Sequence, residues 1–252
     1  MFVRPKKSLG QHFLNDSNIA RKIAESIEGV PETVVEIGPG MGILTRFLVD
    51  KHNNFKVVEI DSESVDYLKE NLNIASDKII FGDFLQINIA PLITENTCII
   101  GNFPYNISSQ IFFKILENRQ NVSQTVCMIQ KEVAERIAAP PGSKTYGILS
   151  VLLQAFYNIK YLFTVNEHVF VPPPKVKSAV IKLTRNNVAK LDCNEELFFK
   201  IVKTAFNQRR KTLRNSLRSF YTTEKLSNEI FDKRPEQLGV NEFIELTKLV
   251  NT

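Results

Sequence analysis

The chain has 252 residues, of which 43% are hydrophobic and 23% are charged, and it carries a formal net charge of +5. These values exclude a wholly disordered chain and leave room for one large domain and a smaller one. The first fourteen residues contain Arg4, Lys6 and Lys7 and lack the apolar stretch of a secretory signal, and no later segment is long and apolar enough for a membrane span, so we expect a cytoplasmic protein.

The potential metal ligands are scattered along the chain and show no paired spacing. They are Cys98, Cys127 and Cys193 among the cysteines and His12, His52 and His168 among the histidines. We therefore predict reduced thiols and no bound metal. The pI of about 9.0 fits an anionic partner but is also found in enzymes that never contact nucleic acid.

From about residue 34, short β-rich runs alternate with helical ones, which is typical of a parallel sheet covered by helices. Strands are predicted at 34–37, 55–60, 78–81 and 97–100, with helices at 43–50, 62–74 and 107–118. Later strands are predicted at 124–130 and 176–184, as a possible antiparallel addition, with a helix at 147–157. The fold class is thus α/β, with a mostly parallel, Rossmann-like sheet.

A change of pattern near residue 186 predicts a domain boundary. From Asn194 onward only helical periodicity remains, and Val202 to Phe220 places its apolar side chains on one helical face. We expect a domain of residues 1–186 followed by a small all-helical domain of residues 187–252.

A glycine turn follows the first predicted strand, and an acid follows the second. Gly38, Gly40 and Gly42 bring the backbone close to a ligand, and Glu59 can accept hydrogen bonds from two ribose hydroxyls. The pair indicates a nucleoside site. The spacing is GxGxG, which does not favour a pyrophosphate, so we predict S-adenosylmethionine as the cofactor.

Two further acids fit that cofactor. Glu36 precedes the glycine turn and suits a sulfonium or ammonium group. Asp83, in the loop after the third predicted strand, can accept a hydrogen bond from the adenine amino group.

The turn after the fourth predicted strand reads Asn102-Phe103-Pro104-Tyr105. An adenine N6 amino group is a poor nucleophile, so catalysis needs acceptors for its two hydrogens. Asn102 offers its side-chain oxygen, and proline fixes the direction of a neighbouring carbonyl. Tyr105 offers a ring on which an extruded base can stack. No general base is needed, since positioning and oriented dipoles supply the rate enhancement.

These motifs together resemble the KsgA/RsmA family of ribosomal RNA adenine dimethyltransferases over nearly the whole chain. They are QHFL at 11–14, VEIGPGMG at 35–42, VVEID at 57–61, GDF at 82–84, GNFPYNIS at 101–108, QKEV at 130–133, FVPPPKVKSAV at 170–180 and RRKTLRNSL at 209–217. His12 and Phe103 depart from the asparagine and leucine common there.

The resemblance implies roles for single residues. Those toward the donor are His12 and Leu14 in the N-terminal segment, Gly38 at the amino-acid part, Glu59 at the ribose, Asp83 at the adenine and Asn102 at the reacting edge. It also implies that Phe170 packs on the target base opposite Tyr105. The implied reaction is N6-dimethylation of two adjacent adenosines near the 3′ end of small-subunit (16S) ribosomal RNA, within an immature subunit.

Basic residues predict phosphate contacts that position an RNA without reading its sequence. The candidates are Arg209, Arg210, Lys211 and Arg214 in the helical region and Lys175 and Lys177 after Pro172-Pro173-Pro174. We expect a monomer. Three alternatives stay open: an Erm-type enzyme that methylates large-subunit ribosomal RNA, a non-catalytic RNA-binding assembly factor, and a nicotinamide-dependent dehydrogenase, in which the NFPY segment would have no role.

Overall fold

The computed structural model describes residues 3–72 and 74–251. By contacts between its residues the chain separates into two compact units. The first comprises Met1–Ala134 and Lys160–Arg185, and the second comprises Glu135–Ile159 and Asn186–Thr252. Residues 135–159, which we expected in the first domain, lie in the second unit because α5 (Ile148–Gln154) packs against helices near the C-terminus.

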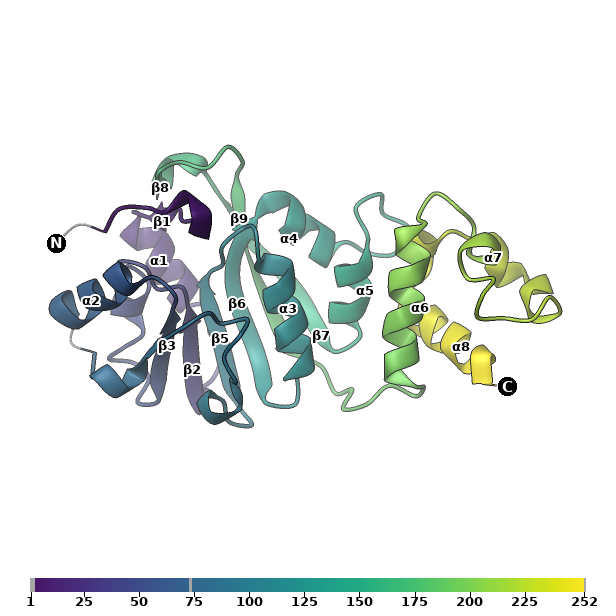
Figure 1. Cartoon of the computed structure of the whole chain (residues 1–252), viewed down its shortest axis with the longest axis horizontal. Helices are drawn as coiled ribbons and strands as arrows, with labels where there is room; N and C mark the ends of the chain where they lie inside the picture. The colour runs from purple at the N-terminus through teal and green to yellow at the C-terminus, as the bar shows by residue number, and fades with distance from the viewer. Residues whose placement is uncertain (1–2, 73, 252) are drawn as a thin grey trace. The chain divides into compact units, whose positions relative to one another are not determined.

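A seven-stranded sheet organises the first unit, in the order β4-β3-β2-β5-β6-β9-β7 (Figure 1). Its strands are β2 (Thr33–Ile37), β3 (Phe55–Glu59), β4 (Ile79–Phe81), β5 (Thr97–Asn102), β6 (Val122–Gln130), β7 (Tyr157–Val165) and β9 (Ser178–Arg185). The strands from β4 to β6 are parallel, and β9 pairs with β6 antiparallel. The predicted α/β class is confirmed. Of the two strands expected as an antiparallel addition, β9 is antiparallel, whereas β6 continues the parallel sheet beside β5.

The strand order places a ligand site. From β2 the chain continues to β3 on one side, and later to β5 on the other, so the order reverses at β2. At such a point the loops after the carboxyl ends of the strands diverge and leave a crevice. The glycine turn follows β2, Glu59 ends β3, and Asn102 ends β5, so all three lie at this crevice.

Four helices and a small second sheet complete the first unit's elements. The helices are α1 (Ser17–Ala24), α2 (Ser62–Asn71), α3 (Ser108–Glu117) and α4 (Lys131–Ala138), the last of which crosses the boundary at 134. β1 (Phe13–Leu14) and β8 (Phe170–Val171) pair antiparallel. Short 3-10 turns are η1 (Lys7–Leu9), η2 (Thr45–Phe47), η3 (Ser76–Lys78), η4 (Ala90–Leu92) and η5 (Glu167–Val169).

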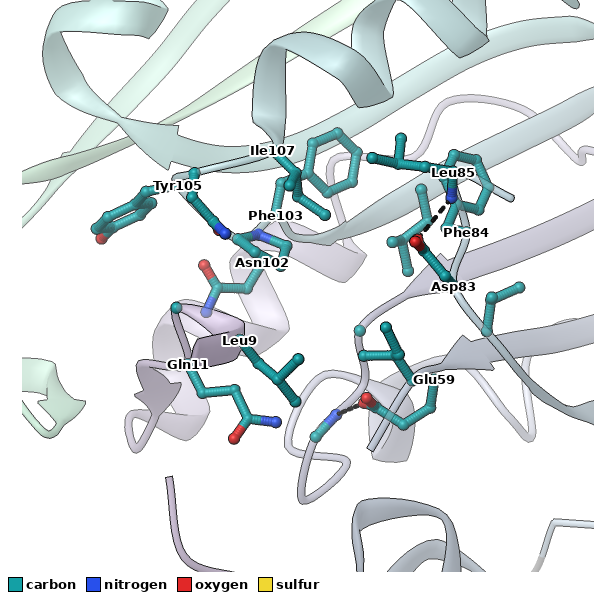
Figure 2. A pocket seen from close by; sticks show the side chains of 18 of the residues that line it. Leu9, Gln11, Glu59, Asp83, Phe84, Leu85, Asn102, Phe103, Tyr105 and Ile107 are labelled. Atoms are coloured by element: carbon teal, nitrogen blue, oxygen red, sulfur yellow. Dashed lines mark hydrogen bonds between the residues drawn. The ribbon is translucent and has the colours of Figure 1, made fainter. Parts of the chain in front are cut away.

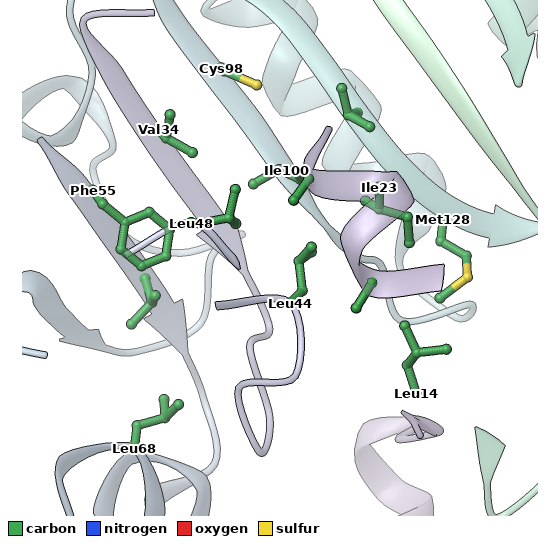
Figure 3. Close-up of a cluster of buried hydrophobic side chains, with 14 of the residues drawn as sticks. Leu14, Ile23, Val34, Leu44, Leu48, Phe55, Leu68, Cys98, Ile100 and Met128 are labelled. Atoms are coloured by element: carbon green, nitrogen blue, oxygen red, sulfur yellow. The ribbon is translucent and has the colours of Figure 1, made fainter. Parts of the chain in front are cut away.

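The core of the first unit forms because its central strands are buried on both faces, as their continuous apolar sequence predicts. Every residue of β2 is buried. On one face, alternate residues of the strands pack with α1, α2 and the segment after the glycine turn (Figure 3). This cluster includes Ile23, Val34, Leu44, Leu48, Phe55, Leu68, Ile100 and Met128. α3 covers the other face (Figure 1).

Two predicted helices were wrong in part. Residues 43–50 form turns around η2 instead of a continuous α-helix, because hydrogen bonds that reach back four residues, as from Val49 to Thr45, are mixed with bonds that reach back only three, as from Phe47 and Leu48. The segment 147–157 is helical only over Ile148–Gln154, after which the β-branched and aromatic residues of β7 extend the sheet.

The second unit contains α5, α6 (Glu195–Asn207), α7 (Leu213–Ser216) and α8 (Val240–Asn251), with short 3-10 turns η6 (Lys225–Ser227), η7 (Glu229–Asp232) and η8 (Pro235–Gln237). α6 packs against α5 and α8. The helical character expected from Asn194 onward is present. The helical face drawn through Val202 to Phe220 is interrupted, because turns separate α6 from α7.

Candidate active site

A cavity of about 930 Å³, measured with its open mouth, lies at the carboxyl ends of β2, β3, β4 and β5. Its wall is built from five separate segments of the first unit (Figure 2). They contribute Ser8 to Phe13, Ile37 with Gly38 and Gly40, Val58 to Ile60, Gly82 to Leu85, and Asn102 to Ile107. The structure thus brings most of the donor-site and catalytic residues predicted from the sequence to one cavity.

The glycine turn and Glu59 form one hydrogen-bonded unit. The Glu59 carboxylate accepts from Gly40 N at 2.9 Å and from Asp61 N at 2.9 Å. Burial raises the pKa of Glu59, while these backbone donors oppose that rise. A carboxylate has about four acceptor positions, so Glu59 is fixed in place by its backbone donors and can still accept from hydroxyl groups.

Asp83 lies in a loop that α3 supports. Its Oδ1 accepts from Leu85 N at 2.9 Å. Lys114 donates to the carbonyl oxygens of Leu85 and Ile87 at 3.1 and 2.6 Å and so holds the loop from the other side. Asp83 is partly exposed at the cavity wall, with acceptor capacity left for an amino group.

The orientation of the Asn102 amide is determined by a backbone carbonyl. Its Nδ2 donates to His12 O at 2.9 Å. A carbonyl oxygen only accepts, so the nitrogen must face it and Oδ1 is the atom left for a ligand. Pro104 O accepts from Ile107 N at 3.2 Å, whereas among the described residues no hydrogen bond is found to Phe103 O. Asn102 Oδ1 and Phe103 O thus have no hydrogen-bond donor among the described residues.

Tyr105 lines the cavity with its ring already in contact with another ring. The His12 imidazole stacks on it, with centroids 5.5 Å apart and ring planes 25° apart, and His12 Nδ1 lies 2.8 Å from Pro172 O. The Tyr105 hydroxyl bonds to Ser178 Oγ at 2.5 Å. Burial raises the pKa of Tyr105, so the phenol stays neutral and does not act as a base.

Phe170 is not placed as the family resemblance implied. It is only 2% exposed and belongs to the hydrophobic core, where β8 pairs it with Leu14. Its ring offers no accessible face to a base in this structure. The ring in contact with Tyr105 is that of His12.

Leu14 and Glu36 line a second, smaller cavity that shares Gly38 and Asn102 with the main one. Glu36 is 1% exposed, and its carboxylate accepts from the Thr45 hydroxyl at 2.7 Å. Burial raises the pKa of Glu36 to about 8, against the effect of that hydrogen bond. At neutral pH Glu36 is therefore largely protonated, which weakens the expectation that it faces a cationic group.

The basic residues fall into two classes. Arg209 donates to Lys144 O and lies 3.7 Å from Glu236, and Arg214 binds Asp232 and Leu226 O within the second unit. Arg210 and Lys211 are exposed. Lys175 and Lys177, in the first unit, are exposed as well. The predicted phosphate contacts of Arg209 and Arg214 compete with these internal hydrogen bonds.

Sequence reasoning missed one wall of the cavity, made by residues 8–11 of the N-terminal segment. The signal that could have indicated it was Gln11, the first residue of the QHFL motif. Asp61, which ends the VVEID motif, was also missed as a partner of this segment. Within residues 3–72 and 74–251, no group of three potential ligands lies close enough to hold a metal, and no helix has the length and apolarity to cross a membrane.

The residues present fit S-adenosylmethionine. Glu59 offers acceptors for two ribose hydroxyls, and Asp83 offers one for an amino group beside the apolar side chains of Ile60 and Phe84. At Gly38 an added Cβ would meet nothing within 4 Å, so the backbone there is open to a ligand. The residues that line the cavity include no lysine or arginine, whereas a pyrophosphate group would favour a cluster of such cations.

Comparison with known proteins agrees with this interpretation. The family model described as ribosomal RNA adenine dimethylase matches residues 3–248. The chain is 59% identical over 252 residues to the Ribosomal RNA small subunit methyltransferase A of Flavobacterium johnsoniae, covering 98% of this chain and 96% of that one. It is 58% identical to the protein of the same name from Phocaeicola vulgatus, covering 98% and 90%.

Two solved structures share the fold over nearly the whole chain. A dimethyladenosine transferase from Plasmodium falciparum has a TM-score of 0.80 and 26% identity, covering 95% of this chain and 98% of that one. The 23S rRNA methyltransferase ErmE has a TM-score of 0.70 and 26% identity, covering 94% and 99%. The cofactor is S-adenosylmethionine, and the chain belongs to the ribosomal RNA adenine dimethylase family.

Proposed function

We propose that this chain transfers two methyl groups to the N6 nitrogen of each of two adjacent adenosines near the 3′ end of small-subunit ribosomal RNA. We further propose that it acts as a monomer, in the cytoplasm, on an immature ribosomal subunit. The observation that carries the proposal is the fixed amide of Asn102 at the edge of the donor cavity. Its Nδ2 donates to His12 O, so its Oδ1 is available to a ligand.

Bound S-adenosylmethionine supplies an electrophilic methyl group. Glu59 and Asp83 hold the adenosine part at the far end of the cavity from the NFPY turn (Figure 2). Asn102 Oδ1 and Phe103 O accept the two hydrogens of the target amino group. Accepting both favours a pyramidal nitrogen with its lone pair available, and the proton released after transfer passes to water.

The target base must leave its stack to reach these acceptors. Tyr105 is fixed by Ser178 on its hydroxyl and by His12 on its ring, so it presents an ordered aromatic surface. The rings of Tyr105 and His12 are 5.5 Å apart and already in contact, so a base cannot insert between them. We infer that the base stacks on Tyr105 from the side opposite to His12.

RNA would be held by basic residues whose side chains are exposed. In the second unit Arg210 and Lys211 are exposed, and in the first unit Lys175 and Lys177 are exposed. Such residues bind phosphates without regard to sequence. The choice of adenosines then depends on the shape of the subunit rather than on these cations.

The second candidate is methylation of large-subunit ribosomal RNA, because the fold of ErmE is also similar. The two relatives from Phocaeicola vulgatus and Flavobacterium johnsoniae, which are named for the small subunit, are 58% and 59% identical to this chain, against 26% for ErmE. This difference favours the small subunit. A nicotinamide-dependent dehydrogenase is excluded by the family.

The test is methyl transfer to purified ribosomal subunits that lack the modification. The chain is incubated with labelled S-adenosylmethionine and either small or large subunits, and modified adenosines are mapped by mass spectrometry. We expect dimethylated adenosines at two adjacent positions near the 3′ end of small-subunit RNA. Label in large-subunit RNA would support the Erm-type activity, and binding to small subunits without transfer would support an assembly factor.

A further inference from the structure

One wall of the donor cavity is a strap formed by residues 6–12. It contains η1 and leads into β1, and Ser8, Leu9, Gly10, Gln11 and His12 all line the cavity. The remaining walls come from the loops after the sheet strands. The strap therefore closes a site whose other parts are carried by the sheet.

The strap is in close contact with the NFPY turn. Gly10 has a φ of +64°, and a Cβ added there would lie 2.7 Å from Asn106 Oδ1. His12 O continues the contact by accepting from Asn102 Nδ2, and the next residue, Phe13, pairs with Val171 of β8. At this end the strap is held by backbone pairing.

The carboxylate of Asp61 binds two residues of the strap. Lys6 Nζ donates to Asp61 Oδ1 at 2.5 Å, and Gln11 Nε2 donates to Asp61 Oδ2 at 3.1 Å. Gln11 Oε1 accepts from Lys6 N at 2.8 Å, which joins the two strap residues. Lys6 also lies 3.0 Å from the half-exposed Glu63.

Asp61 also contacts the ribose-binding acid. Its backbone N donates to Glu59 Oε1 at 2.9 Å, while its carboxylate holds the strap. The Asp61 side chain is fully buried, whereas that of Lys6 is 36% exposed. If the strap opens, the buried Asp61 carboxylate loses its cation, which is strongly destabilising. Opening of the strap therefore also disfavours the position of Asp61 in which its backbone N–H fixes Glu59.

We propose that Asp61 and Lys6 are positioning residues that couple closure of the strap to binding of the donor. This inference rests on the proposed donor site. Neither residue lines the cavity. Lys6 and Asp61 act through Gln11 and Glu59, by keeping the strap against the cavity and the ribose acceptor in its position.

The test measures S-adenosylmethionine affinity by calorimetry for Lys6→Met, Asp61→Asn and the double variant of the full chain. Asparagine keeps only one oxygen, either for Gln11, which binds Asp61 Oδ2, or for the helix cap at Glu63 N, which binds Oδ1, so Lys6→Met is the cleaner of the two single variants. We expect each single variant to bind the donor about tenfold more weakly than the wild type. Because the two residues act through one ion pair, the double variant should lose no more affinity than the single variant with the larger loss.

Two control variants separate this role from general effects of charge. Lys7→Met removes an exposed cation from the same strap and should leave donor affinity unchanged, and Lys6→Arg should keep it near the wild-type value. The maximal rate at saturating donor should change less than about twofold for Lys6→Met, while the donor KM rises.

Wild-type donor affinity in Lys6→Met or Asp61→Asn would overturn the coupling, as would an equal loss in Lys7→Met. Failure of the wild-type chain itself to bind S-adenosylmethionine would instead overturn the donor site.

Discussion

At the scale of single residues, two buried carboxyls dominate the electrostatics of the site. Glu36 and Glu59 are 1% and 3% exposed, and burial raises the pKa of both. Glu59 has backbone donors on both oxygens, whereas Glu36 has only the Thr45 hydroxyl as an identified side-chain donor. Glu59 is therefore better placed to serve a ligand as an anion, and Glu36 to act as a neutral structural group.

Glu36 should make the stability of the donor-free protein depend on pH. Its pKa is about 8 in the folded chain against an ordinary value of 4.5, so between these values the folded state holds a proton that the unfolded state has lost. Stability then falls as pH rises through this window, by at most about 1.4 kcal/mol per pH unit. Glu36→Gln removes this loss.

Urea unfolding at pH 5 and pH 8 checks this prediction. The variant should exceed the wild type in stability at pH 8 by far more than at pH 5. Glu59 adds its own pH dependence to both proteins, so only the difference between them counts. An equal difference at the two pH values would contradict the assigned pKa of Glu36.

At the scale of elements, the sequence predicted those parts of the site that follow strand ends. Gly40, Glu59, Asp83 and Asn102 meet because the carboxyl ends of neighbouring parallel strands share one edge of the sheet. Strand periodicity and local turn residues are enough to predict that meeting.

The remainder depends on packing between distant segments. Lys6 and Asp61 lie 55 positions apart and form an ion pair that no local pattern encodes. The ring of Phe170 is buried in the hydrophobic core. Arg214 binds partners in the turns around residues 226 and 232. Such contacts between residues far apart in the sequence cannot be predicted from local patterns and require the folded structure.

The turn after β2 should tolerate no side chain at Gly40. Its φ is +56°, and an added Cβ would lie 2.7 Å from the ring of Phe13, which β1 holds in place. Gly40→Ala should reduce both donor affinity and stability, by more than the roughly 1–2 kcal/mol of a left-handed alanine. Gly29→Ala is the matched control, because Gly29 has a φ of +67° and open space around it. Equal melting temperatures for the two variants would refute the steric argument.

At the scale of the whole molecule, RNA binding should depend on those cations that the fold leaves exposed. Replacing Arg210 and Lys211 with alanine should reduce the slope of log affinity against log salt by about 0.7–0.9 for each phosphate that these side chains neutralise in the wild type. The melting temperature should stay unchanged.

Arg214→Ala provides the contrast. It removes the bonds to Asp232 and Leu226 O, so it should lower the melting temperature. An unchanged salt slope in the Arg210 and Lys211 variant would exclude direct phosphate binding by these residues.

The central claim is that Asn102 Oδ1 accepts a hydrogen of the target amino group. The most direct measurement is the single-turnover rate of methyl transfer to small subunits by Asn102→Ala, at saturating donor and RNA. We expect a loss of about 100-fold or more, as for removal of one preorganised transition-state partner, with RNA affinity unchanged. A transfer rate near that of the wild type would contradict the account.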